Sequence, residues 1–142
     1  MSNGLNGKSL FIDFDSTFVK VETIDEIARI TLQDNPDKDQ IVKKISNITN
    51  QAMSGKMDFP TALEKRLHIL SITDKTINIV TNEIKELVSD SFCNHKDFIK
   101  ENASDIWIIS GGFTDVIIPI VKSYGISENH VLANQFIFDG DK

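Results

Sequence analysis

Two short apolar runs, each followed at once by acidic or small residues, constrain the fold of this chain most strongly. Residues 8–12 end in Leu10-Phe11-Ile12 and precede Asp13-Phe14-Asp15-Ser16-Thr17, and residues 106–109 precede Ser110-Gly111-Gly112. Short apolar runs are typical of buried strands, and of parallel sheets in particular. In open α/β sheets, ligands bind just beyond the carboxyl ends of the strands. The two runs therefore predict an α/β fold with a candidate site at these strand ends.

Helical periodicity fills the sequence between the two predicted strands. Four apolar stripes have the spacing of one helix face: Ile24, Ile27, Ala28 and Thr31; Ile41, Ile45, Ile48 and Ala52; Phe59, Ala62, Leu63, Leu67 and Leu70; Ile77, Val80, Ile84 and Leu87. Thr23 with Glu26 is a capping-box pattern, and Asp58 and Thr73 are the expected caps of the third and fourth helices. We therefore expect a four-helix insertion at residues 21–88, between core segments 1–20 and 89–142.

Strands and a helix alternate again after the insertion. The apolar stripe from Phe113 to Tyr124 predicts an amphipathic helix that Gly125 ends. Pro119 lies inside that helix and should kink it or shift its start. Residues 131–133 and 135–138 predict two further short strands. The order of these elements supports the α/β fold class.

The composition is that of an ordinary globular protein and argues against nucleic-acid binding. The 142 residues are 40% hydrophobic and 25% charged, the formal net charge is −6, and lysines and arginines form no dense stripe. The single cysteine, Cys93, fits a reducing, cytoplasmic location. No segment approaches transmembrane length, so we expect neither a membrane nor a nucleic acid as a partner.

Asp13 and Asp15 are suited to acid–base and metal chemistry. Repulsion between two close carboxylates separates their pKa values, so that one serves as a nucleophile while the other carries a proton. Together they offer the oxygen ligands that Mg²⁺ prefers. The glycines after Ser110 allow close backbone approach, and a helix N-terminus favours phosphate. Alone, each motif is also explained by a turn, an Asx-type turn at Asp13 and a tight strand-to-helix turn at Ser110.

On these residues the chain resembles the haloacid dehalogenase superfamily and, within it, the phosphoserine phosphatase branch. Asp13, Asp15 and Thr17 match the first superfamily motif, Asp-x-Asp-x-Thr. Ser110 matches the second, a serine or threonine at the end of the next core strand. The branch adds a helical cap between these motifs and a glutamate soon after the first, which Glu22 matches.

A stretch of the insertion is similar to the substrate-reading segment of that branch. It runs from Ala52-Met53-Ser54-Gly55 through Phe59 to Arg66-Leu67. Ser54 stands where many members have glycine. The resemblance implies a Rossmann-like α/β core, incomplete in this chain, with an inserted four-helix cap.

The resemblance also implies a role for each matched residue. Asp13 would be the nucleophile that forms an aspartyl-phosphate, and Asp15 the general acid and base. Both would hold Mg²⁺, Asp15 through its backbone carbonyl. The substrate-binding residues would be Ser110, Gly111 and Gly112 at the phosphate, Glu22 at the ammonium, Arg66 at the carboxylate, and Met53 and Phe59 as an apolar lid. The implied reaction is the Mg²⁺-dependent hydrolysis of O-phosphoserine to serine and phosphate, in serine biosynthesis.

The residues themselves leave alternatives open for the substrate-binding positions. Arg66 shares a face with Phe59 two helical turns away, and an arginine on an apolar face needs an anion, either in a structural salt bridge or in a substrate. Glu22 also fits an exposed charge near a helix N-terminus. Met53 and Phe59 also fit ordinary core packing.

In the family pattern, further elements follow Ser110: a phosphate-binding lysine and a Gly-Asp-Gly-x-x-x-Asp-type loop with the last Mg²⁺ ligand. Asp139-Gly140-Asp141 does not follow a suitable strand and is interpreted as a terminal turn. We therefore expect a C-terminally truncated core, with the first strand as an exposed apolar edge and little turnover by these residues alone.

Three origins fit such a chain: a truncated or proteolysed protein, a piece of a longer, bifunctional serine-pathway protein, or a shortened relative without catalysis. The alternative function is accordingly a non-catalytic, phosphate-ligand-binding or regulatory domain of such a longer protein. A third is a helical interaction domain in which the acidic residues are incidental.

Overall fold

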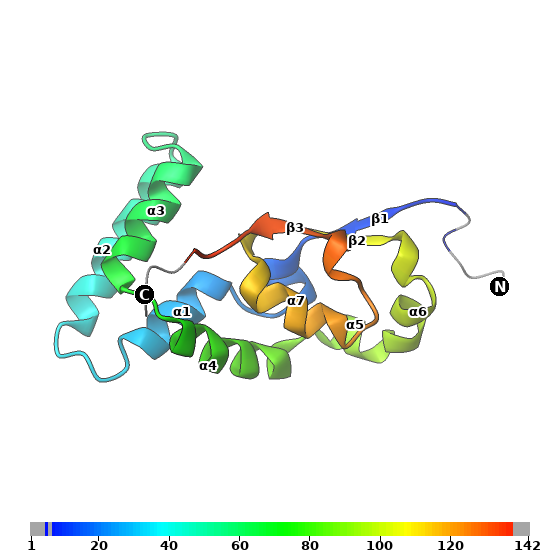
Figure 1. The fold of residues 1–142 in the computed structure, drawn as a ribbon. Coiled ribbons are helices and arrows are strands. Elements are labelled where there is room, and N and C mark those ends of the chain that lie inside the picture. Colours follow the sequence, from blue (N-terminus) through cyan, green and yellow to red (C-terminus); the bar gives the residue numbers. More distant parts are fainter. Residues whose placement is uncertain (1–4, 6, 138–142) are drawn as a thin grey trace.

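A computed structural model describes residues 5 and 7–137 and shows a three-stranded parallel sheet with helices packed along one side (Figure 1). The strands are β1 (Leu10–Ile12), β2 (Ile106–Phe113) and β3 (Val131–Asn134), in the order β1-β2-β3. The α/β class predicted from the sequence is confirmed.

The sheet has one buried and one open face. Ile12, Ile106, Ile108 and Val131 are buried, whereas Phe11, Ile109 and Leu132 are exposed. Successive residues of a strand point to opposite faces, so this alternation means that helices cover only one side in the described part of the chain. Helix α7 (Thr114–Lys122) covers it and packs on β2 and β3. β1 lies at the sheet edge with Phe11 58% exposed, as the sequence predicted.

The four helices predicted between β1 and β2 are confirmed. They are α1 (Thr23–Thr31), α2 (Lys38–Met53), α3 (Phe59–Leu70) and α4 (Asp74–Ile84). α1 packs on α4, and α4 packs on α7, whereas α2 packs on α3. In Figure 1, α1 and α4 lie along the core and the α2–α3 pair projects from it. The insertion thus has an inner pair and an outer hairpin, and its behaviour as a separate cap domain stays a prediction.

Both ends of the insertion leave the core at one place. Val19 and Val88 form an isolated antiparallel bridge. The N–H of Lys20 donates to the carbonyl of Leu87, and the N–H of Ser89 donates to the carbonyl of Phe18, both at 2.8 Å. A short backbone ladder therefore joins the two crossings next to the first acidic motif.

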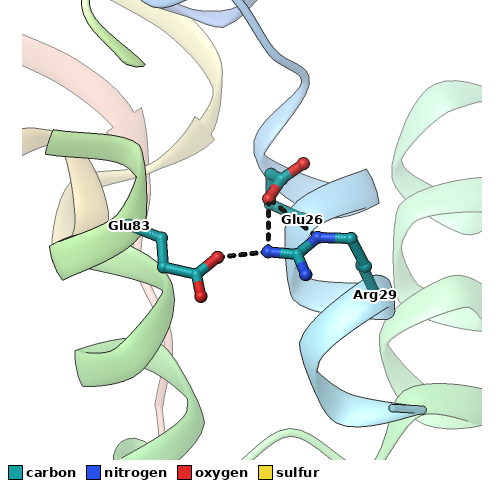
Figure 2. Close-up of polar contacts among 3 residues, drawn as sticks. All are labelled: Glu26, Arg29 and Glu83. Carbon is teal, nitrogen blue, oxygen red and sulfur yellow. Dashed lines mark hydrogen bonds and ion pairs between the residues drawn. The ribbon is translucent and has the colours of Figure 1, made fainter. Parts of the chain in front are cut away.

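Charged side chains tie α1 to α4 on the surface (Figure 2). Arg29 of α1 pairs with Glu26 one turn earlier, at 3.1 Å, and with Glu83 of α4. All three side chains are partly in solvent, and exposed ion pairs contribute little to stability. These ion pairs therefore help to orient α1 against α4 and add little to the free energy of unfolding.

The remaining helices are short. α5 (Asp90–Asn94) and α6 (Lys96–Glu101) follow the insertion. Single tighter turns cover Lys85–Leu87, Ala103–Asp105 and Glu128–His130. Among the described residues, none of the helices has both the length and the apolar character that crossing a membrane requires.

Local predictions of caps and helix ends were partly right. Thr73 caps α4 by accepting the Thr76 N–H at 3.2 Å, and Gly125, at φ +83°, follows the end of α7. α7 continues through Pro119. The capping box at Thr23 was wrong: Glu22 precedes the helix, and the Thr23 hydroxyl donates to Asp15 instead.

Two strand predictions also need correction. β2 continues through Ser110, Gly111 and Gly112 to Phe113, with a register irregularity after Ile109, so the glycines end the strand and do not open α7.

Residues 135–137 are not in a strand, because the Phe136 N–H donates to the Asp115 carboxylate and its ring stacks on Phe113. Phe138 and Asp139-Gly140-Asp141 lie outside the described residues.

Candidate active site

The first acidic motif lies on a tight turn that the core holds in place. Phe14–Phe18 forms a turn after β1 that the Val19 N–H closes by donating to the Phe14 carbonyl at 3.1 Å, with non-helical backbone at Asp15 and Ser16, and Phe14 and Phe18 are fully buried. These two rings point into the core, and Asp13 and Asp15 lie at the carboxyl end of the sheet, where they line a cavity. One oxygen of Asp13 accepts the N–H of Phe14 at 2.7 Å, which fixes that carboxylate beside the strand end.

A cavity of about 400 Å³ lies beyond the ends of β1 and β2, between the core and the insertion. Most of the predicted site residues line it: Asp13, Asp15, Glu22, Phe59, Arg66, Ser110, Gly111 and Gly112. Ser16, Thr17, Ile24, Leu63 and Phe113 complete the lining. The predicted residues from two distant segments and from α3 thus meet in one place.

Met53 is the predicted residue that the structure does not bring to the cavity. It is the last residue of α2, its side chain is 83% exposed, and it is not among the lining residues. The fold therefore gives it neither the lid position implied by the resemblance nor a place in the core.

The glycines after Ser110 allow close contacts with both sides of the cavity. The hydroxyl of Ser110 accepts the N–H of Gly112 at 2.8 Å. A Cβ atom at Gly112 would lie 3.1 Å from that hydroxyl and 3.4 Å from Oδ2 of Asp15. At Gly111, it would lie 3.1 Å from Cζ of Phe59. The lack of side chains here lets the acidic motif approach β2 and lets α3 cover it.

Asp15 has the environment of a proton donor. The hydroxyl of Thr23, which is fully buried, donates to Oδ1 of Asp15 at 2.5 Å. Burial raises the pKa of Asp15, and the charges of Glu22 and Asp13 raise it further, while the Thr23 hydrogen bond opposes the rise. A raised pKa keeps a carboxyl protonated to higher pH, which suits a general acid.

Glu22 is held by the same turn. The hydroxyl of Ser16 donates to Oε2 of Glu22 at 3.0 Å. The N–H of Ser16 donates to the carbonyl of Val21 at 2.9 Å, which closes the loop between them. Ser16 itself is in the left-handed region, at φ +57°.

Arg66 is a buried cation without a carboxylate partner. Its residue is 8% exposed, its Nε donates to the carbonyl of Ala62 and its Nη1 to the hydroxyl of Thr49, both at 3.2 Å. Within the described part of the chain, it makes no ion pair. Burial lowers the pKa of Arg66, and the charges of Asp25 and Glu22 oppose this. The structural salt bridge considered from the sequence is thus not formed there.

The carboxylates at the end of β1 fit a hydrated cation better than a closed metal cage. No group of three or more histidine, cysteine or acidic side chains that could hold a metal occurs among residues 7–137. Mg²⁺ keeps several waters and is often bound by one or two carboxylates. Asp13 and Asp15 both line the cavity and could supply the carboxylate oxygens that such a hydrated Mg²⁺ needs.

Curated relatives match nearly the whole chain. A phosphoserine phosphatase of Drosophila melanogaster is 30% identical over 127 residues, which cover 89% of this chain and 44% of the relative. A phosphoserine phosphatase of Methanocaldococcus jannaschii is 31% identical over 136 residues, which cover 95% of this chain and 59% of the relative. The chain thus spans about half the length of the curated relatives it matches. No family model matches it.

Solved structures show the same relation. A phosphoserine phosphohydrolase-like protein of Francisella tularensis superposes with a TM-score of 0.76 at 32% identity, over 94% of this chain and 61% of that one. A substrate-bound phosphoserine phosphatase superposes with a TM-score of 0.68 at 27% identity, over 95% of this chain and 60% of that one. A phosphoserine phosphatase with a phospho-aspartyl intermediate analogue superposes with a TM-score of 0.64 at 26% identity, over 94% of this chain and 59% of that one. In sequence and fold, the chain is therefore similar over nearly all of its length to phosphoserine phosphatases of the haloacid dehalogenase type.

Proposed function

We propose that the cavity hydrolyses O-phosphoserine to serine and phosphate through a phosphorylated Asp13, with Mg²⁺ as the cofactor. The observation that carries the proposal is the contrast between two neighbouring carboxyls. Asp13 is exposed and fixed through one oxygen, whereas Asp15 is more buried and has a raised pKa. Their difference supplies a nucleophile and a proton donor within one cavity.

The chemistry requires two displacements at phosphorus. An Asp13 oxygen attacks the phosphorus, the bond to the serine oxygen breaks, and Asp15 gives its proton to that leaving oxygen. Asp15, now ionised, then takes a proton from water, whose oxygen attacks the same phosphorus. The bond to Asp13 breaks, phosphate leaves, and both carboxyls return to their starting states.

Charge balance in the cavity supports a metal cofactor. Among the described residues that line the cavity, Arg66 is the single cation, against the acidic Asp13, Asp15 and Glu22. Bound by the Asp13 carboxylate and the Asp15 carbonyl, Mg²⁺ would offset the charge of the transferring phosphoryl group. Ser110 and the N–H of Gly111 would hold the phosphate oxygens, and the N–H of Gly112, which donates to the Ser110 hydroxyl, would orient that hydroxyl.

The remaining lining residues suit an amino-acid phosphate. The guanidinium of Arg66 has no ion-pair partner in the part of the chain that the structure describes and would bind the substrate carboxylate, and Glu22 would bind the substrate ammonium. Phe59 would exclude water from above Gly111. We place this activity in cytoplasmic serine biosynthesis, where the reaction yields serine.

Thermal unfolding of the chain with Mg²⁺ and beryllofluoride, an aspartyl-phosphate mimic, tests the proposal. We expect both together to raise the melting temperature, because a ligand that binds only the native state stabilises it, by about 2.7 kcal/mol at a hundredfold excess over Kd. The Asp13→Asn variant should show no such gain. No shift in either chain would contradict the proposal.

A second arm of the experiment addresses catalysis. Phosphate release from phosphoserine is measured for the chain and for Asp13→Asn. Binding of phosphoserine without any release, unchanged in Asp13→Asn, would favour the non-catalytic phosphate-binding domain instead. Release that survives in Asp13→Asn would refute Asp13 as the nucleophile.

A further inference from the structure

Two neighbouring pairs of residues hold each other across the loop that follows β1. Ser16, next to Asp15, donates its hydroxyl to Glu22 at 3.0 Å. Thr23, next to Glu22, donates its hydroxyl to Asp15 at 2.5 Å. Each pair thus contains one carboxylate and one hydroxyl, and each hydroxyl serves the carboxylate of the other pair.

The carboxylates of Asp15 and Glu22 carry like charge and lie close enough to interact. The charge of Glu22 raises the pKa of Asp15, which shows that they repel each other. A hydroxyl that donates to each carboxylate reduces that repulsion and fixes the side chain. Thr23 is fully buried, so its hydrogen bond competes little with water.

The backbone of the loop is adapted to this arrangement. Ser16 is at φ +57°, in the left-handed region that non-glycine residues rarely adopt. Such conformations persist where the surroundings impose them, and they cluster at functional sites. In this conformation Ser16 donates its N–H to the Val21 carbonyl and its hydroxyl to Glu22.

The hydrogen bonds also leave one oxygen of each carboxylate available to a ligand. Oε2 of Glu22 accepts from Ser16, which leaves Oε1 for a second donor. Oδ1 of Asp15 accepts from Thr23, while Oδ2 is the oxygen nearer to the position above Gly112, at the floor of the cavity.

From this geometry we infer that Ser16 and Thr23 form a reciprocal brace, which positions Glu22 for a substrate ammonium and Asp15 for the ester oxygen as one unit. The inference rests on the proposed function and adds two positioning residues to it. Because the brace links the two pairs, loss of either hydroxyl releases both carboxylates. An amine on the substrate is then recognised through Ser16 and Thr23 as well as through Glu22.

The test compares dissociation constants of O-phosphoserine and of its desamino analogue, 3-phosphonooxypropanoate, measured by calorimetry with Mg²⁺. We expect Ser16→Ala and Thr23→Val each to weaken phosphoserine binding roughly three- to tenfold, the range of one lost hydrogen bond, and to weaken the analogue less, because both esters contact Asp15 but only phosphoserine also contacts Glu22. The double variant should lose no more than the larger single loss, because one broken bond already releases the brace.

Matched variants separate positioning from general loss of structure. Thr23→Ser and Ser16→Asn keep a donor, and asparagine tolerates the left-handed backbone, so both should retain the preference for phosphoserine. Thr81→Val removes another buried threonine hydroxyl, which donates to the Ile77 carbonyl at 2.7 Å outside the cavity, and should leave both dissociation constants unchanged.

The outcomes distinguish the brace from the proposed function. An unchanged preference in both single variants, losses that multiply in the double variant, or an equal loss for the analogue would overturn the brace alone. An unmodified chain that binds neither ester would contradict the proposed function, and with it the role of the brace in substrate recognition.

Discussion

Replacement of Arg66 by methionine should stabilise the chain without ligand and remove its response to phosphoserine. Arg66 is 8% exposed, and within residues 7–137 its hydrogen-bond acceptors are two neutral groups, the Ala62 carbonyl and the Thr49 hydroxyl. A buried charge without a counter-charge is costly, and methionine keeps much of the apolar side-chain volume.

The magnitude follows from what the substitution removes and leaves. The Thr49 hydroxyl still donates to the Ile45 carbonyl, so no buried donor loses its only partner. Exchange of buried charged groups for apolar ones of similar volume is neutral or stabilising by about 1–4 kcal/mol. Because two hydrogen bonds are lost as well, we expect about 1 kcal/mol, or roughly 2–5 °C in melting temperature.

The assay is thermal unfolding of the chain and of Arg66→Met, with and without phosphoserine. Without ligand the variant should melt higher, and with saturating phosphoserine the order should reverse, since only the unmodified chain gains a bound carboxylate. The control is Arg29→Met, at the only other arginine of the chain. Arg29 is exposed and already paired with Glu26 and Glu83, so its loss should not raise the melting temperature.

Two results would refute the reasoning. If Arg66→Met melts well below the unmodified chain, the guanidinium is stabilising without ligand, and its burial is not a cost. If phosphoserine stabilises Arg66→Met as much as the unmodified chain, Arg66 does not bind the substrate.

Three further predictions concern single groups. Burial, with a hydrogen bond to Cys93, raises the pKa of the single tyrosine, Tyr124, to about 12, so stability from the neutral phenol is present below its unfolded value of about 10 and is lost as pH rises towards 12. Ultraviolet titration of the folded chain with a midpoint near 10 would contradict this. Gly111→Ala should weaken phosphoserine binding, because its Cβ would lie 3.1 Å from Cζ of Phe59; the added Phe59→Leu change should restore part of the affinity in calorimetry. Asp15→Asn should melt higher than the unmodified chain at pH 7 without metal, because burial penalises the ionised carboxyl, and the gain should vanish as pH falls and Asp15 is protonated; a lower melting temperature at pH 7 would count against the raised pKa.

Features that one segment determines were predictable from the sequence. The apolar stripes of the four insertion helices and the cap at Thr73 depend on spacing and on local hydrogen bonds, and the structure confirms them. The ends of the strands were less predictable. β2 extends through two glycines because Phe113 pairs with Asn134 of β3, a contact that spacing does not reveal.

The same division applies to the candidate site. The motif residues at Asp13 and Ser110 were identified because each follows an apolar run. Thr23 was missed, because a threonine before an apolar stripe has the pattern of a cap, and only the fold shows that its hydroxyl goes to Asp15. The one signal available in the sequence was the position of Thr23 directly after the candidate ligand Glu22.

The bridge between Val19 and Val88 has a consequence for how such proteins diversify. Since the chain leaves and re-enters the core at adjacent positions, the distance between Val19 and Val88 does not depend on the length of the helical insertion between them. The outer hairpin of α2 and α3 packs mainly on itself, so exchange or resizing of this part need not disturb the sheet. Substrate preference, which the proposal assigns partly to α3, is therefore free to evolve separately from the phosphoryl-transfer chemistry at the strand ends.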